Sequence, residues 1–322
     1  MRAVQLVELA GPEGLRLVEI VEPHDPTRVV IDVHAAGVCF PDLLQTTGSY
    51  QMSRELPCVL GLEGAGVVRS APEGSDLATG RRVAVLTAEG GSWQQTVIAD
   101  RSSVFPLPDS VSLTAGAGFL VNYLTAHFAL DERARYRAGD VVLVHGAGGG
   151  LGIAALHIAA ALGLETIAVV SNLEKAAVSA DSGATHVVMT DGWKQRVQQI
   201  TNGHGVDIIL DPVGGGRFTD SLRSLAPNGR LIVLGFAGGE IPTVKVNRLL
   251  LKNISVMGAG WGEYLQTNPG HLARQWKALY PLLESGVLRV PEPTLYPSTH
   301  AADALGSVKE RSAIGKVALS FD

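Results

Sequence analysis

One glycine-rich turn carries the clearest chemistry in this sequence. A continuous apolar run, VVLVHG, leads into Ala147, Gly149 and Gly152, and a helical pattern of small residues follows without a gap. Glycines at this spacing let the backbone approach a pyrophosphate, whose charge the free N–H groups and the dipole of the following helix attract. The spacing therefore predicts a dinucleotide site, with Gly150 and Leu151 completing its backbone. An ordinary tight turn between a strand and a helix is the alternative.

The end of the second apolar run indicates which dinucleotide the turn would bind. In domains that prefer NAD, an acid about 20 residues past the turn holds the ribose 2′-hydroxyl. Here Ser171 and Asn172 occupy that region, and Lys175 follows them. A lysine could reach a 2′-phosphate as a point charge, so the expected cofactor is NADPH. Glu174 argues against this interpretation, and Lys175 could instead be a solvated residue of the next helix.

Six apolar runs, most of them separated by helical stretches, would position this turn. Their apolar residues are continuous rather than alternating, which is typical of parallel strands covered on both faces. A complete doubly wound dinucleotide fold uses six such strands. The last run would form an edge, which predicts pairing with a second copy in a homodimer. In chain order the runs read VVLVHG, ETIAVV, THVVM, DIILDP, RLIVLGF and ISVMGA.

The first third of the chain has a different pattern. Short β-rich runs such as RVVIDVHAAG and WQQTVIA are separated by Gly, Pro and Asp, as in an irregular, mostly β domain. The last residues, GKVALSFD, form a β-like tail that could return to this domain. The predicted fold class is therefore α/β, with a doubly wound parallel sheet and a second, mostly β domain.

Length and composition exclude several classes of protein. The chain has 322 residues, of which 46% are hydrophobic, so two packed domains are expected. A formal net charge of −5 without a long basic run disfavours binding to nucleic acid or to an anionic membrane. His157 and Glu165 interrupt the longest apolar stretch, which disfavours a membrane span. The lack of a secretory pattern and the unpaired Cys39 and Cys58 predict a cytoplasmic protein.

The order and spacing of several segments resemble those of one enzyme family. The segments are AAGVCFPDLLQTTGSY, LGLEGAGVV, FLVNYLTAHFAL, HGAGGGLG, DPVGG, GFAGG, LLLKNISVMG and AIGKV. Over essentially its whole length, the chain is similar to zinc-free members of the medium-chain dehydrogenase/reductase superfamily, in the NADPH:quinone oxidoreductase (zeta-crystallin-like) family. The resemblance implies a GroES-like catalytic domain at 1–119 and 260–322, and a Rossmann domain at 120–259.

The resemblance also assigns residues to the cofactor. Thr125 would hold the nicotinamide end with Asn122 close by, and Asn253 would lie near the nicotinamide or its ribose. Asp211 could cap a turn instead of contacting the cofactor, and Asn253 could pair with the loop backbone. The loops after the fourth and fifth strands would line the dinucleotide through Asp211, Val213, Gly214, Gly235 and Phe236.

Zinc-dependent relatives hold their catalytic metal with a cysteine in a G-V-C-x-x-D motif, a histidine in a G-H-E motif and a later cysteine or acid. This chain keeps Cys39 in the first motif, but Leu62 replaces the histidine, and no cysteine follows Cys58. No metal is therefore expected. Cys39 also differs from the asparagine common in quinone oxidoreductases. It would be a small filler of the cleft wall, because a reactive thiolate needs a positive neighbour that the sequence does not reveal.

The lack of a zinc ligand set points to acceptors that need no Lewis acid. Hydride transfer to a conjugated acceptor spreads negative charge onto an oxygen, so approach geometry and one hydrogen-bond donor suffice. Tyr50 is the candidate donor, with a surface aromatic as the alternative. Cys39 and Phe40 are expected to line the substrate pocket. Trp261 and Tyr264 could line it too, or be ordinary interdomain packing.

These features predict an NADPH-dependent reductase of a small-molecule quinone or related enone. Within enzymes, the alternative is an enoyl-thioester reductase, which also reduces a conjugated C=C bond. A protein that binds NADPH without turnover, in a binding or structural role, is the alternative from another class.

Overall fold

The computed structural model describes residues 1–52 and 54–321. The chain divides into two compact units, Met1–Val121 with Trp276–Asp322, and Asn122–Gln275. The chain therefore returns from the second unit to the first between residues 275 and 276, whereas the sequence led us to expect this boundary between residues 259 and 260. Residues of segment 261–275 pack within the second unit, where Trp261 Nε1 donates to Gln275 Oε1 over 2.8 Å. Each unit is described by itself below.

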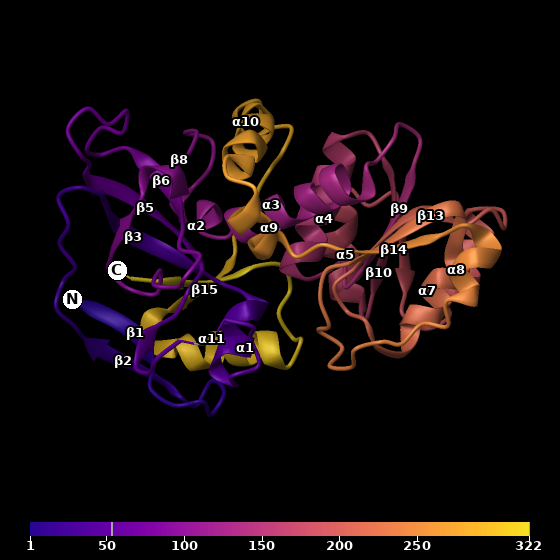
Figure 1. The fold of residues 1–322 in the computed structure, drawn as a ribbon, viewed down its shortest axis with the longest axis horizontal. Coiled ribbons are helices and arrows are strands. Elements are labelled where there is room, and N and C mark those ends of the chain that lie inside the picture. Colours follow the sequence, from indigo (N-terminus) through magenta and orange to yellow (C-terminus); the bar gives the residue numbers. More distant parts are fainter. Residues whose placement is uncertain (53, 322) are drawn as a thin grey trace. The chain divides into compact units, whose positions relative to one another are not determined.

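The second unit is built on a six-stranded sheet (Figure 1). All of its strand pairs are parallel, and their order is β11-β10-β9-β12-β13-β14. This order confirms the predicted doubly wound sheet: β10 and β11 are added on one side of β9, and β12, β13 and β14 on the other, so the strand order reverses between β9 and β12. The strands are β9 (Val141–His145), β10 (Glu165–Val170), β11 (His186–Met189), β12 (Val206–Asp211), β13 (Leu225–Val233) and β14 (Ser255–Gly258).

Helices α4 to α8 connect these strands, α3 precedes the first of them and α9 follows the last, and apolar residues of helices and strands build the core. Leu143 and Ile209 from neighbouring strands pack with Trp193, Phe218 and Leu222 from two of the helices. The helices are α3 (Leu120–Phe128), α4 (Gly150–Ala161), α5 (Leu173–Asp181), α6 (Trp193–Ile200), α7 (Phe218–Ser224), α8 (Asn247–Lys252) and α9 (Trp261–Thr267).

The first unit contains a seven-stranded sheet in the order β15-β16-β3-β5-β6-β8, with β7 on β3, and a three-stranded sheet β2-β1-β4. Strand β16 pairs antiparallel with β3, which confirms that the C-terminal tail returns to this domain. The strands are β1 (Arg2–Leu6), β2 (Leu15–Glu19), β3 (Val29–Val38), β4 (Cys58–Val59), β5 (Glu63–Ser70), β6 (Arg82–Leu86), β7 (Thr96–Ala99), β8 (Val104–Pro106), β15 (Thr294–Pro297) and β16 (Val317–Ser320).

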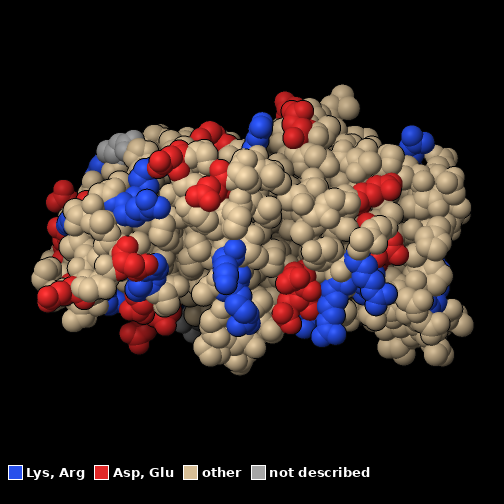
Figure 2. All heavy atoms as spheres, turned by 90° about the horizontal axis from the view of Figure 1, so that it is seen from above, with Lys and Arg blue, Asp and Glu red and all other residues tan. Residues whose placement is uncertain are grey.

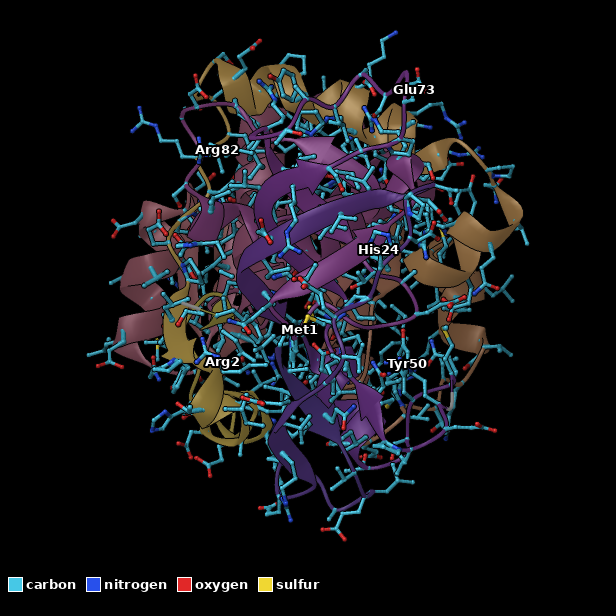
Figure 3. The ribbon with its side chains drawn as sticks, turned by 90° about the vertical axis from the view of Figure 1, so that its left-hand side faces the viewer. Met1, Arg2, His24, Tyr50, Glu73 and Arg82 are labelled. Atoms are coloured by element: carbon cyan, nitrogen blue, oxygen red, sulfur yellow. The ribbon has the colours of Figure 1, made fainter. Side chains whose placement is uncertain are left out.

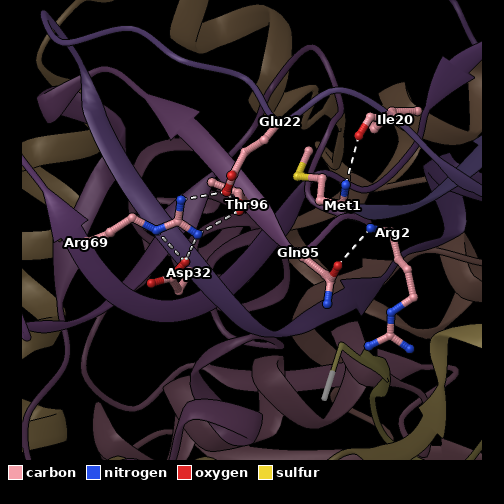
Figure 4. Close-up of polar contacts among 8 residues, drawn as sticks. All are labelled: Met1, Arg2, Ile20, Glu22, Asp32, Arg69, Gln95 and Thr96. Atoms are coloured by element: carbon pink, nitrogen blue, oxygen red, sulfur yellow. Dashed lines mark hydrogen bonds and ion pairs between the residues drawn. The ribbon is translucent and has the colours of Figure 1, made fainter.

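In the described part of the first unit, the helices are α1 (Phe40–Thr46), α2 (Leu113–Gly116), the first two residues of α3, most of α10 (His271–Glu284) and α11 (Ala301–Lys309). The core contains the buried Trp93, whose Nε1 donates to Gly37 O over 3.0 Å. On the sheet surface, the Arg69 guanidinium bonds the carboxylates of Asp32 and Glu22 (Figure 4). These are exposed contacts, each of which stabilises the fold only weakly.

Charge on the surface is mixed in sign. On the face drawn in Figure 2, acidic and basic side chains are interspersed among uncharged ones. Within residues 1–52 and 54–321, none of the helices combines the length and apolar character needed to cross a bilayer.

Candidate functional site

The predicted phosphate turn joins the end of β9 to the start of α4. Gly146 follows β9 with a φ of 61°, and its carbonyl accepts from Gly149 N over 3.0 Å. Gly149 is the N-cap of α4, with extended backbone at φ −92° and ψ 170°. The first N–H groups of a helix have no partner inside it. The turn therefore presents the donors and the positive helix end that an anion requires.

Two glycines of this turn are needed for different reasons. A Cβ on Gly152 would lie 2.4 Å from Gly146 O and 2.6 Å from Ala147 Cα, so the packing of α4 on the turn excludes a side chain there. A Cβ on Gly149 would meet nothing nearer than Gly146 O at 3.5 Å, which is ordinary contact. The protein's own packing therefore leaves room at Gly149, where the predicted ligand would approach the backbone.

Lys175 reaches the same turn from α5. A Cβ on Gly148 would lie 2.5 Å from Lys175 Cβ and 2.7 Å from its Cγ, so the lysine stem runs directly against Gly148. Burial lowers the pKa of Lys175. The Asn172 side chain accepts from Lys175 N over 2.8 Å and caps α5, while Ser171 is exposed. The lysine is thus beside the phosphate turn, as the NADPH prediction requires.

The loop after β12 and the loop after β13 are joined by backbone hydrogen bonds. Asp211 is 1% exposed, and its Oδ1 accepts from Val213 N and Gly214 N, both over 2.9 Å. Burial raises the pKa of this carboxyl, against the lowering effect of the two N–H donors. Oδ1 therefore caps the turn, whereas Oδ2 is buried with no hydrogen-bond partner among the described residues, so a contact between Asp211 and the cofactor stays a prediction. A Cβ on Gly214 would lie 3.1 Å from Phe236 Cδ1, and Gly235 adjoins Phe236 in the facing loop.

The other proposed nicotinamide residues lie on helices of the second unit. Asn122 and Thr125 are half-buried and three residues apart on α3, so they share one face of that helix. Asn253 ends α8 with a φ of 52° and is exposed. A left-handed conformation of this kind is one that asparagine tolerates. The backbone role of Asn253 at this helix end is clear, and its contact with the cofactor stays a prediction.

Trp261 and Tyr264 pack inside the second unit. The buried Trp261 bonds Gln275, and the Gln275 side chain donates to Leu124 O over 2.7 Å. The Tyr264 ring lies 4.8 Å from the Phe128 ring, centroid to centroid. These contacts hold α9 against α3. A role for either aromatic side chain in an acceptor pocket stays a prediction.

In the first unit, Cys39 lies at the start of α1, followed by Phe40, which is half-buried and packs against the core. Asp42 Oδ2 accepts from Cys39 N over 2.7 Å, and its Oδ1 accepts from Gly61 N over 3.2 Å. One carboxylate thus joins the two motifs in which zinc-dependent relatives carry metal ligands. Tyr50 is half-buried in the segment that follows α1 (Figure 3).

Lys316 supplies the positive neighbour of Cys39 that the sequence did not reveal. Its Nζ donates to Cys39 Sγ over 3.1 Å and to Glu63 Oε1 over 2.6 Å. Burial lowers the pKa of Lys316, but the negative charge of Glu63 and the hydrogen bonds to Glu63 and Cys39 raise it above the ordinary lysine value. An ammonium group therefore bonds Cys39, the one side chain here that matches a zinc ligand of the relatives, and Leu62 offers no ligand atom. These residues do not fit a zinc site.

Comparison with known proteins adds independent observations. The family model "Zinc-binding dehydrogenase" matches residues 150–284, and "Alcohol dehydrogenase GroES-like domain" matches residues 25–109. The chain is 36% identical over 327 residues to Quinone oxidoreductase-like protein 2 of Bos taurus, covering 99% of this chain and 92% of that protein. Together with the sheet order, these matches confirm the predicted fold class, a Rossmann domain with a GroES-like domain.

Two solved structures are informative neighbours. The quinone oxidoreductase of Thermus thermophilus, determined also in complex with NADPH, is 33% identical with a TM-score of 0.86, and the match covers 100% of both chains. The enoyl reductase CurK is 25% identical with a TM-score of 0.88, and the match covers 100% of this chain and 99% of that one.

Proposed function

Because this chain belongs to the quinone oxidoreductase family of medium-chain dehydrogenases/reductases, we propose that it binds NADPH and reduces a quinone or related conjugated enone without a metal ion. The observation that most strongly supports this proposal is the glycine-rich turn at the start of α4, with the Lys175 stem packed against Gly148. A cofactor with two linked phosphates and a third phosphate on its ribose fits this combination of donors and charge.

The residues of the second unit fit NADPH on structural grounds. The open approach at Gly149 suits close contact between the backbone and a pyrophosphate. Lys175 would pair with the 2′-phosphate, and the joined loops after β12 and β13 would line the dinucleotide through Val213, Gly214, Gly235 and Phe236. A neighbour of known structure, the Thermus thermophilus quinone oxidoreductase, has been determined with NADPH bound.

When bound, NADPH would supply a hydride, which carries the two electrons of the reduction. The chain's own residues would bind and orient the two reactants. Asn122 and Thr125 would hold the nicotinamide end, and Tyr50 would donate a hydrogen bond to the acceptor oxygen as negative charge develops there. One proton from solvent then completes the hydroquinone, or the saturated ketone when the acceptor is an enone.

An enoyl-thioester reductase is the second candidate. It is favoured by the likeness to the enoyl reductase CurK along the whole chain. Both reactions deliver a hydride to a conjugated system, so the fold does not separate them. A protein that binds NADPH and oxidises it with none of the acceptors would have a binding or structural role instead.

The test is NADPH oxidation by the purified protein across quinones, simple enones and crotonyl-CoA, with NADH in parallel. The proposal predicts the highest kcat/KM with a quinone or enone, and faster turnover with NADPH than with NADH. A higher kcat/KM with crotonyl-CoA would favour the enoyl-thioester reductase. Activity that is lost on dialysis against a chelator and restored by zinc would contradict the metal-free mechanism.

A further inference from the structure

A buried ion pair in the first unit joins Lys316, near the C-terminal end of the chain, to Glu63. Lys316 Nζ and Glu63 Oε1 are 2.6 Å apart, and their side chains are 9% and 0% exposed. Taking both charges out of water is expensive, and an apolar pair of similar volume is often as stable or more so. Fold stability alone is therefore a weak reason for this pair.

Two glycines make the room that the pair needs. A Cβ on Gly37 would lie 2.8 Å from Glu63 Oε1 and 2.6 Å from Ala117 O. A Cβ on Gly118 would lie 2.6 Å from Lys316 Cγ. A side chain at either position would displace one member of the pair, so the surrounding backbone is shaped around it.

The second oxygen of Glu63 reaches helix α3. Glu63 Oε2 accepts from Val121 N over 2.9 Å, in the first turn of the helix that begins at Leu120. Leu120 is fully buried. An N–H of a first helical turn has no partner inside its helix, and a negative group there also complements the helix dipole. Glu63 thus holds Lys316 with one oxygen and the start of α3 with the other.

Cys39 completes the cluster as a neutral thiol. Its Sγ accepts from Lys316 Nζ over 3.1 Å and lies 3.4 Å from Glu63 Oε1, to which only a protonated thiol can donate. Burial raises the pKa of this thiol well above its usual value, against the lowering effect of Lys316. Cys39 therefore stabilises the ion pair through hydrogen bonds, and as a neutral thiol it is not an activated nucleophile.

We infer that Glu63, oriented by Lys316, is a positioning residue that sets the start of α3 and, through it, Asn122 and Thr125 at the nicotinamide end. The inference rests on the proposed function. Helix α3 runs without interruption from Leu120 to Phe128, so the placement of its first turn is carried to both side chains. A shift of about 1 Å in a reactive arrangement can slow a reaction on the order of a hundredfold.

The test compares two double variants that remove both members of the Glu63–Lys316 ion pair, so neither member is left without the other. Glu63→Gln with Lys316→Met keeps an oxygen that can accept from Val121 N. Glu63→Met with Lys316→Met has nearly the same shape and lacks that acceptor. Because neither contains half of an ion pair, both are expected to fold. The Glu22→Gln variant, which removes a carboxylate from the exposed Arg69 cluster of the same unit (Figure 4), is the control for loss of charge alone.

Three readouts follow for each variant: amide hydrogen exchange at Val121, the dissociation constant for NADPH, and the single-turnover rate of NADPH oxidation by a quinone. The double variant with Glu63→Met should exchange faster at Val121 than the one with Glu63→Gln, and should transfer hydride on the order of tenfold more slowly. NADPH affinity should change much less, because the phosphate turn is untouched. Glu22→Gln should match the wild type in all three readouts.

Equal single-turnover rates in the two double variants would overturn the inference. So would a fall in NADPH affinity as large as the fall in rate, because that result would show a general loss of structure. A wild-type protein that oxidises no NADPH would instead refute the proposed function. In that case the exchange at Val121 and the affinity for NADPH still test whether Glu63 acts on α3.

Discussion

At the scale of single residues, two glycines of the phosphate turn have different roles: the fold requires Gly152, and the proposed ligand requires Gly149. Gly152 has no room for a Cβ against Gly146 O, whereas Gly149 has ordinary space and a φ that any residue adopts. The two glycines are three residues apart, and both lie at the start of α4. Substitution by alanine should therefore affect stability at one position and ligand binding at the other.

Gly149→Ala should cost about 0.5–1 kcal/mol of stability, because alanine is a poorer N-cap than glycine. It should weaken NADPH binding strongly, because the new methyl group stands where the pyrophosphate must approach. Gly152→Ala should cost about 1–3 kcal/mol or more through overpacking against backbone. Denaturant unfolding and NADPH titration measure the two effects. Unchanged NADPH affinity in Gly149→Ala would contradict the assignment of the turn.

Whether the sequence predicts a site residue depends on whether its contacts are local in the chain. The phosphate turn is local, so its glycine spacing and flanking pattern are visible in the chain. Lys316 is not local: it reaches Cys39 because β16 pairs antiparallel with β3, with Val317 opposite Val38. In the sequence it is visible only within the AIGKV segment, whose pattern predicts no contact with Cys39. Asp211 faces the backbone of its own turn, and this orientation also depends on coordinates.

At the scale of elements, helices α3 and α4 are joined by a partly buried polar contact. Tyr123 Oη and His157 Nδ1 are 2.7 Å apart. Burial lowers the pKa of His157 to about 4, from an ordinary value of about 6.5. Because the unfolded chain binds this proton first, the contribution of His157 to stability falls as pH drops from about 6.5 to about 4.

His157→Gln should remove that part of the acid sensitivity. Within this pH range, wild-type stability should fall by about 1.4 kcal/mol per pH unit more than that of the variant. The comparison must be made between the two proteins, because burial raises the pKa of Asp42 to about 7 and acts in the opposite direction. Parallel stability curves from pH 4 to pH 6.5 would contradict the assignment.

Strand β14 is an edge of the six-stranded sheet, as predicted from the apolar run ISVMGA. Leu250 and Leu251, in the helix that precedes it, are 74% and 79% exposed. An open edge beside exposed apolar side chains favours pairing with a second copy of the chain. We expect a homodimer in solution, and Leu250→Glu with Leu251→Glu should shift it toward the monomer. Light scattering that shows a monomeric wild type at all concentrations would contradict this expectation.

At the scale of the whole molecule, the fold was more predictable than the acceptor. Continuous apolar runs separated by helices specify a doubly wound sheet, and the observed strand order agrees. The proposed acceptor contact comes from a loop side chain, Tyr50, and strand and helix patterns do not constrain such side chains. Quinone and enoyl reductases also share this architecture, so the choice between them belongs to experiment.

Calorimetric titration of the folded protein with NADPH and NADH tests the central claim most directly. The account predicts that the wild type binds NADPH more tightly than NADH. Lys175→Met, which keeps the stem against Gly148 and removes the charge, should reduce that preference on the order of tenfold or more, because a hydrogen bond to a charged group contributes about 1.5–3 kcal/mol. Protein that unfolds cooperatively but binds neither coenzyme would contradict the account.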